Sequence, residues 1–153
     1  MSLWPVAELL PHSGSAILID EIIAFDEDTL VARARVKSAG LFNQADGSLP
    51  AWIGLEIMAQ TVAAWAGCRA LRDGVPVKPG FLLGTRRYDC RVPAFTAGSN
   101  LTISVACSLQ DETGIGTFDC ELREAGQILA SARLNAYSPP NVNDFLQEAP
   151  PSK

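Results

Sequence analysis

The sequence has little of what metal centres, redox motifs and nucleic-acid-binding surfaces require. Its 153 residues include a single histidine, and its four cysteines form no Cys-x-x-Cys pair, so we expect neither a metal site nor a cofactor. Acidic residues outnumber basic ones by 17 to 12, which gives a net charge of −5 at pH 7. Because phosphate binding needs a basic field, nucleic acid is not an expected partner.

Long apolar runs are also missing. No segment reaches the roughly 20 consecutive apolar residues that a membrane span needs. The N-terminal stretch "MSLWPVAELLPHSG" has neither a basic leader nor an apolar run before a small-residue cleavage site. We therefore expect a cytoplasmic protein without membrane association. In that reducing compartment we expect reduced core thiols at the four cysteines, which lie in apolar patterns: Cys68, Cys90, Cys107 and Cys120.

What the chain does contain is enough apolar residue for one folded domain. Hydrophobic residues make up 48% of the sequence, and a chain of this length can bury most of them in a single core. We place that domain at residues 1–138. The remaining residues, 139–153, are rich in Pro, Asn and Ser, and we expect them to form a flexible tail.

Hydrophobic periodicity predicts one long helix and six strands. The helix opens at Pro50, after a polar loop in which Asp46 or Ser48 supplies the cap, and it stops at Gly74. A short helix follows Pro5. The predicted strands are a hairpin of residues 16–25 and 29–36, then an antiparallel meander of residues 81–92, 99–110, 116–126 and 127–138.

The long helix is apolar on every side, with residues such as Ile53, Met58 and Trp65 leaving no polar stripe. Such a helix must be covered all round. One flat sheet covers only part of it, so the sheet must curl around the helix or a second subunit must cover the rest. Six antiparallel strands wrapped on one central helix form the hotdog fold, an α+β architecture. Because its open sheet edges pair with another copy, we expect a homodimer or a larger assembly.

One carboxylate, Glu56, interrupts this helix within the stretch "PAWIGLEIMAQTVAAWAGC". At helical spacing it shares one side with Trp52, Gln60, Ala63 and Gly67. Two interpretations are open. Glu56 is favoured by the helix dipole and reaches water between subunits, or it lies desolvated in a cavity, where a carboxyl group donates or accepts a proton.

Three blocks of the sequence resemble the hotdog-fold β-hydroxyacyl-acyl-carrier-protein dehydratases. "PAWIGLEIMAQ" resembles the motif that opens their central helix, "LLPHSGSAILIDEI" is similar to their Leu-Pro-His turn and first strand, and "FLLGTRRYDCRVPAFTAGSNL" looks like their next strand and turn. The blocks keep the family's order and spacing between Leu9 and Tyr137. In form they are most similar to the aryl-polyene-type dehydratases.

The resemblance implies dehydration, or the reverse hydration, of β-hydroxyacyl thioesters on acyl-carrier protein or coenzyme A, in fatty-acid, polyketide or aryl-polyene synthesis. It places Glu56 at the position of the catalytic acid. The family's catalytic histidine lies in a Gly-His-Phe-Pro segment before the helix, whereas here the loop reads "GLFNQADGSLP". His12, in the Leu-Pro-His turn, is then the expected base, because α-proton removal requires one.

Further roles follow from the same resemblance. Ala51 falls at the family's glycine position, so the N–H groups of the first helical turn, with Trp52 beside it, are expected to hold the thioester oxygen as charge develops. Gln60, one turn after Glu56, is expected to orient its carboxyl group. Basic side chains would dock an acidic carrier protein, and the candidates are Arg69, Arg72, Arg86 and Arg87.

The missing loop histidine leaves two other functions open. A helix carboxylate in the hotdog fold also activates water, which would make the protein an acyl thioesterase. Alternatively, the chain is a non-catalytic subunit that completes the site of a catalytic partner in a heterodimer.

Overall fold

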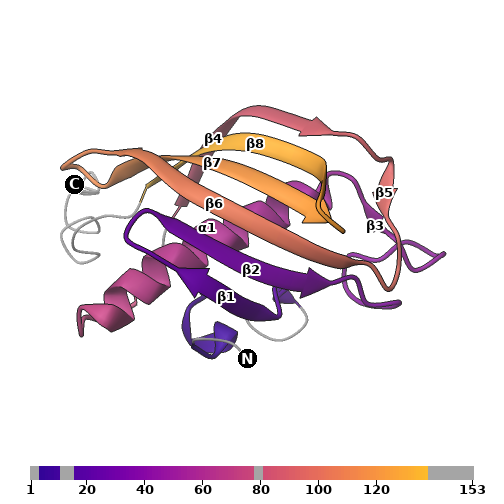
Figure 1. The fold of residues 1–153 in the computed structure, drawn as a ribbon, viewed down its shortest axis with the longest axis horizontal. Helices are drawn as coiled ribbons and strands as arrows, with labels where there is room; N and C mark the ends of the chain where they lie inside the picture. The colour runs from indigo at the N-terminus through magenta and orange to yellow at the C-terminus, as the bar shows by residue number, and fades with distance from the viewer. Residues whose placement is uncertain (1–3, 11–15, 78–80, 138–153) are drawn as a thin grey trace, which may run out of the picture.

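The computed structural model describes residues 4–10, 16–77 and 81–137, and it confirms the α+β hotdog architecture (Figure 1). His12 and the predicted tail at residues 139–153 lie outside the described residues. The elements in chain order are η1 (Val6–Glu8), β1 (Glu21–Phe25), β2 (Thr29–Arg35), β3 (Leu49–Pro50), α1 (Ile53–Arg72), β4 (Phe81–Cys90), β5 (Ala94–Phe95), β6 (Asn100–Gln110), β7 (Ile115–Glu124) and β8 (Gln127–Tyr137).

The main sheet has six antiparallel strands in the order β1-β2-β6-β7-β8-β4. The predicted hairpin is present as β1 and β2. The predicted four-strand meander is wrong in one respect, because only β6, β7 and β8 follow one another in the sheet. The edge of β6 that β4 would have taken is occupied by β2. Strand β4 therefore pairs with β8 and forms the opposite border of the sheet.

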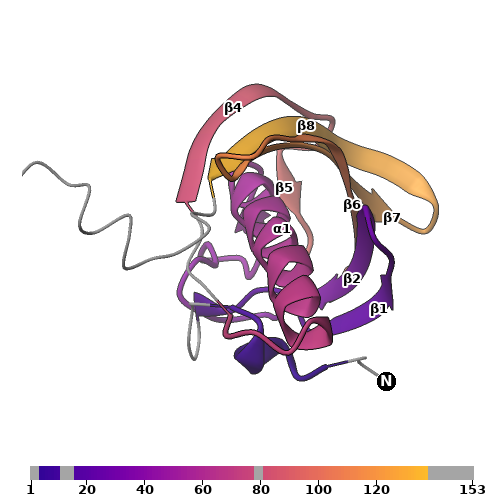
Figure 2. The same cartoon turned by 90° about the vertical axis from the view of Figure 1, so that its left-hand side faces the viewer.

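The core lies between the concave face of this sheet and α1 (Figure 2). Alternate side chains of the central strands point inward, as the period of two in a strand requires. Fully or nearly fully buried examples are Leu101, Ile103 and Val105 on β6, and Phe118, Cys120 and Leu122 on β7. They pack with buried helix residues such as Ile57, Met58 and Trp65. Burial of each such large side chain contributes about 1.5–3 kcal/mol.

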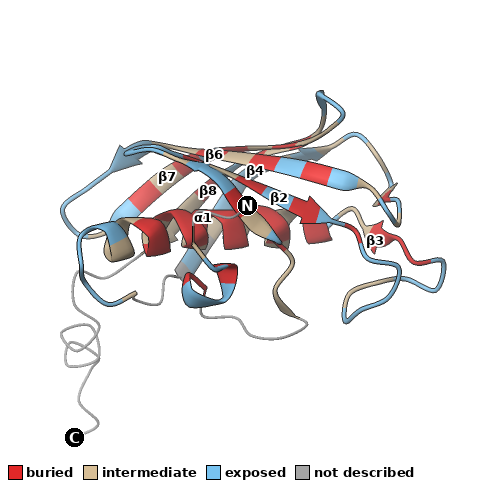
Figure 3. Ribbon diagram, turned by 60° about the horizontal axis from the view of Figure 1, so that its bottom comes forward, coloured by how far each residue is buried: buried red, intermediate tan, exposed pale blue. Residues whose placement is uncertain are grey.

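The side of α1 that faces away from the sheet is only partly covered. The N-terminal segment reaches it at Gly67, where an added Cβ would lie 2.7 Å from the Leu9 carbonyl oxygen. Elsewhere on the helix Ala59, Ala63 and Ala66 remain half-buried, and Figure 3 shows half-buried stretches between the buried ones along α1. The chain's own sheet thus leaves part of the helix perimeter open, as the apolar pattern predicts.

The helix begins three residues later than predicted. Leu49 and Pro50 instead pair with Phe95 and Ala94 as the small β3–β5 ladder. The predicted caps are used elsewhere, because Asp46 Oδ1 accepts hydrogen bonds from the Ser48 N–H at 3.0 Å and from the Ser48 hydroxyl at 2.6 Å. The predicted stop is confirmed: Gly74 has φ 70°, a conformation that glycine adopts without strain.

Candidate active site

Glu56 lies in the first turn of α1, on the border between the buried and the open side of the helix. Its side chain is half-buried, while the next two residues, Ile57 and Met58, are 1% and 0% exposed. Glu56 Oε2 accepts a hydrogen bond of 3.0 Å from the side-chain amide of Gln60. The contact between the candidate acid and Gln60 that helical spacing predicts is therefore present.

Gln60 is fully buried, and each side of its amide group has a partner. Its nitrogen donates to the Ala16 carbonyl at 2.8 Å as well as to Glu56, and its oxygen accepts the Leu18 N–H at 2.8 Å. A flipped amide would set its oxygen against two acceptors, so only one orientation satisfies these groups. Gln60 thus joins Glu56 to the segment from Ala16 to Leu18, a link that the sequence does not reveal.

The turn before α1 carries Ala51 and Trp52. The Ala51 carbonyl accepts hydrogen bonds from the Gly54 N–H at 3.1 Å and from the Tyr88 hydroxyl at 2.5 Å. The Trp52 side chain is 66% exposed, one turn before Glu56. Sequence reasoning missed Tyr88, because it stands among charged residues in "RRYDCR" and nothing local connects it to the helix.

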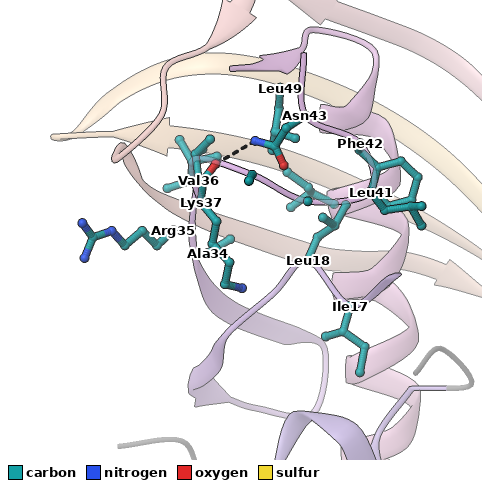
Figure 4. Close-up of a pocket in the computed structure, with 14 residues that line it drawn as sticks. Ile17, Leu18, Ala34, Arg35, Val36, Lys37, Leu41, Phe42, Asn43 and Leu49 are labelled. Carbon is teal, nitrogen blue, oxygen red and sulfur yellow. Dashed lines mark hydrogen bonds between the residues drawn. The ribbon is translucent and has the colours of Figure 1, made fainter. Parts of the chain in front are cut away.

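A cavity of about 230 Å³ with both apolar and polar walls lies near this end of the helix (Figure 4). Its walls include Ile57, which follows Glu56, and Leu18, whose N–H binds Gln60. The other lining residues are Ile17, Ala34, Arg35, Val36, Lys37, Ala39, Gly40, Leu41, Phe42, Asn43, Leu49 and Leu101. Within the described residues, Glu56, Gln60, Ala51 and Trp52 are not among those that line this cavity, so the structure places the candidate acid near the cavity but not on its wall.

The loop that covers this cavity is held by its own polar groups. Asn43 Nδ2 donates to the carbonyl oxygens of Lys37 and Gly47, both at 2.7 Å. Leu41 lies on this loop with 65% of its surface exposed. The loop segment from Gly40 to Pro50 contains no histidine.

Comparison with known proteins decides the family. The ApeP-like family, described as ApeP dehydratase, matches residues 4–147. The chain belongs to the ApeP-like dehydratase family. A structure of the dehydratase heterocomplex ApeI:P from Xenorhabdus doucetiae is similar over 97% of this chain and 99% of that chain, with 34% identity and a TM-score of 0.86. Dehydration, the reaction class that the sequence predicts, is thereby confirmed for the family.

More distant structures share the fold of this ApeP-like chain. The PaaI protein of E. coli, from its phenylacetic acid degradation operon, is 18% identical over 76% of this chain and 80% of its own, with a TM-score of 0.59. A hypothetical thioesterase of Streptococcus pneumoniae with coenzyme A is 16% identical over 77% of this chain and 86% of its own, with a TM-score of 0.58. Among curated proteins, none matches the chain.

Two of the four basic residues predicted to dock a carrier protein lie at the far end of α1 in this ApeP-like structure. Arg69 donates to the Gln110 side chain at 2.9 Å and stacks over the Trp65 ring at 4.7 Å. Arg72 forms ion pairs with Glu27 at 2.8 Å and with Asp73 at 3.0 Å, and these hydrogen bonds, the one to Asp73 first, raise its pKa. At about 1.5 Å per residue, Arg69 is roughly 20 Å along the helix from Glu56.

The other two, Arg86 and Arg87, lie exposed on the border strand β4. Arg87 forms an ion pair with Asp89 at 2.5 Å. Tyr88, the next residue, reaches the start of α1, and because side chains alternate along a strand, Arg87 points to the opposite face of β4. The four predicted docking residues are therefore divided between the end of α1 and the border strand β4.

The cysteines of this ApeP-like chain, Cys68, Cys90, Cys107 and Cys120, are all free. Burial raises the pKa of the Cys68 and Cys120 thiols to about 12. Among the described residues no group of three His, Cys, Asp or Glu side chains is placed to hold a metal ion. No helix in the described part of the chain has both the length and the hydropathy to cross a membrane.

Proposed function

We propose that this protein dehydrates β-hydroxyacyl thioesters of the aryl-polyene type, carried on acyl-carrier protein, as one subunit of a hotdog dimer. The observation that carries the proposal is the Glu56 carboxyl group in the first turn of α1, held at 3.0 Å by a fully buried Gln60. Glu56 does not line the nearby cavity, but its neighbour Ile57 does, and this cavity supports the proposal because it offers room for an acyl chain. Membership of a dehydratase family supports the reaction.

In the proposed reaction a base removes the α-proton of the thioester. The electron pair of that C–H bond moves toward the thioester carbonyl, and negative charge develops on its oxygen. The N–H groups of Ala51 and Trp52, immediately before the first turn of α1, hold this oxygen, since a helix N-terminus carries partial positive charge. The electron pair then returns from the oxygen to form the Cα–Cβ double bond, and the bond between Cβ and the hydroxyl oxygen breaks. Glu56 donates a proton to the departing hydroxyl, which leaves as water.

The base is the part of the site that the described residues do not supply. His12 is the chain's only histidine, and we propose it as the base. The alternative is a base on a second subunit, which the heterocomplex structure of the similar ApeI:P protein supports. In that arrangement this chain provides the acid and the oxyanion donors, and its loop before α1, which contains no histidine, provides no base.

Carrier-protein docking is proposed at the border strand β4. Arg86 and Arg87 are exposed there and lie beside Tyr88, which contacts the start of α1. An acidic carrier protein would be attracted to this basic pair. Arg69 and Arg72 contribute less in this proposal, because Gln110, Glu27 and Asp73 already bind them.

The test is a dehydration assay on the chain alone and on the chain co-purified with a partner hotdog subunit from the same genome. Enoyl thioester formation is followed by absorbance, with 3-hydroxyacyl groups on acyl-carrier protein and on coenzyme A. Glu56→Gln is expected to lower turnover by ~10²-fold or more. Glu112→Gln, which removes an exposed carboxylate in the β6–β7 turn, is the matched control and is expected to keep full turnover.

His12→Ala assigns the base. Loss of turnover in both the chain alone and the complex supports His12. If the chain is inactive without its partner and the complex that carries His12→Ala keeps full turnover, the base belongs to the partner. Release of free thiol from saturated acyl thioesters, without enoyl formation, would overturn the proposal in favour of a thioesterase. Glu56→Gln with normal turnover in an active complex would make Glu56 a structural residue.

A further inference from the structure

The start of α1 is held by a neighbouring strand rather than by a cap of its own. Trp52 occupies the N-cap position, and within the described residues its side chain makes no capping hydrogen bond. The contact that replaces a cap comes from β4, where the Tyr88 hydroxyl donates to the Ala51 carbonyl at 2.5 Å. The position of the first helical turn therefore depends on a residue 37 positions away in sequence.

Two further contacts come from the same part of the chain. Ala94 pairs with Pro50, immediately before the turn. Beneath the turn, an added Cβ at Gly54 would overlap the Tyr88 hydroxyl and would lie 3.0 Å from Phe95 Cζ. Gly54 is thus the position where the absence of a side chain lets the Tyr88 hydroxyl reach the Ala51 carbonyl. The segment from β4 to β5 surrounds the start of α1 on several sides.

The hydrogen bond to Ala51 also fixes the direction of the next N–H group. A trans peptide is planar, so the Ala51 carbonyl and the Trp52 N–H lie in one plane and point in opposite directions. The carbonyl is held from two sides, by the Tyr88 hydroxyl and the Gly54 N–H. The Trp52 N–H must then point out of the N-terminal end of the helix, the direction in which orphan N–H groups of a first turn project.

We propose that Tyr88 is a positioning residue, which orients and polarises the Ala51–Trp52 peptide so that its N–H can hold the thioester oxygen. This inference rests on the proposed dehydratase function. A hydrogen bond donated to a peptide carbonyl strengthens donation by the N–H of the same peptide, because successive hydrogen bonds polarise one another. Tyr88 therefore acts through the Trp52 N–H and does not itself touch the substrate.

The phenol of Tyr88 is suited to this role at any working pH. It is half-buried between β4 and the helix start, and burial, followed by the influence of Cys90, raises its pKa above the ordinary value of 10.0. The hydroxyl thus remains protonated and a donor across the range in which a carboxyl group and a histidine titrate. Removal of the Tyr88 hydroxyl should lower the turnover rate and leave the shape of the curve of rate against pH unchanged.

The first test is Tyr88→Phe in the active assembly, which removes one hydroxyl and keeps the ring. We expect kcat to fall about tenfold, the factor that ~1.4 kcal/mol of transition-state stabilisation represents, with KM changed less than about twofold. The pH profile should keep its shape. Tyr137→Phe, which removes the only other phenol hydroxyl of the chain, at the far end of β8, is the matched control and should keep wild-type kcat.

The second test uses Gly54→Ala, because the added methyl group displaces the Tyr88 hydroxyl. Alone, Gly54→Ala is expected to lower kcat by about the same factor as Tyr88→Phe. The double variant is expected to lose little more than either single variant, since both remove one contact and effects on one contact are not additive. Melting temperatures of all variants, measured in parallel, identify any that do not fold.

The outcomes separate the two proposals. If the wild-type assembly shows no dehydration, the proposed function fails before Tyr88 is tested. If the wild type is active and folded Tyr88→Phe keeps wild-type kcat, Tyr88 is a structural residue and the inference is wrong. A rise in KM with unchanged kcat would likewise overturn it, because that pattern belongs to substrate binding rather than to stabilisation of developing charge.

Discussion

Replacement of Gln60 by leucine should be both destabilising and inactivating. The side chain is fully buried and makes three hydrogen bonds, to Ala16, Leu18 and Glu56. Leucine has a similar volume but leaves the Ala16 carbonyl and the Leu18 N–H without this partner. A polar group left unsatisfied costs about 1–3 kcal/mol when buried. Two such groups are left, on Ala16 and Leu18, and both residues are only half-buried. We therefore expect Gln60→Leu to lower the free energy of unfolding by about 2–4 kcal/mol.

For a domain of this size each kcal/mol corresponds to roughly 2–4 °C, so the melting temperature should fall by about 4–16 °C. Thermal unfolding followed by circular dichroism measures this, with urea unfolding as a check. Thr61→Val is the matched control: Thr61 is also 0% exposed, and its hydroxyl donates to the Ile57 carbonyl of its own helix at 2.8 Å, so its replacement should cost about 1 kcal/mol or less. If Gln60→Leu is no less stable than Thr61→Val, the link between Gln60 and the segment is energetically unimportant.

Four further outcomes concern Glu56, two buried thiols and the assembly. Glu56→Gln should keep the melting temperature in thermal unfolding, because the new amide oxygen still accepts from Gln60 and the side chain keeps its size; a large decrease would mark Glu56 as structural. Cys68 and Cys120 should resist a thiol reagent at pH 8 in the folded protein, since burial raises the pKa of both thiols to about 12. Because burial raises the pKa of both thiols in the folded protein, their contribution to the free energy of unfolding is present below the unfolded pKa of 9.0 and is lost as pH rises toward about 12. Urea unfolding at several pH values measures this loss. Light scattering should give at least twice the 16.3 kDa mass of one chain, whereas a stable monomer would contradict the inference from the partly covered helix.

The parts of the fold that sequence reasoning predicts are those set by local pattern. The apolar helix and its stop at Gly74 are read from residues close in sequence. The position of β4 in the sheet cannot be read in this way. The strands have similar patterns of apolar and polar residues, and none of these patterns indicates which neighbouring strand β4 pairs with. Pro50 shows the same limit: its φ suits the first turn of a helix and also an extended residue, and the choice depends on pairing with Ala94.

The candidate site divides in the same way. Glu56 and Gln60 are four residues apart on a helix, so their contact follows from periodicity. The bonds from Gln60 to Ala16 and Leu18 join residues more than 40 positions apart, and no local pattern reveals them. Arg72 was predicted to face a carrier protein, but it binds Glu27 on the turn between β1 and β2. Only the folded chain brings that acidic partner close.

The close approach of Tyr88 to Gly54 has a consequence for how this sequence can vary among relatives. A side chain at position 54 would overlap the Tyr88 hydroxyl. Conversely, a tyrosine at position 88 can reach the Ala51 carbonyl because position 54 is a glycine. The two positions, 34 residues apart, should therefore change together. Relatives with a larger residue at 54 are expected to have a shorter one at 88, and they would need another group to fix the start of the helix.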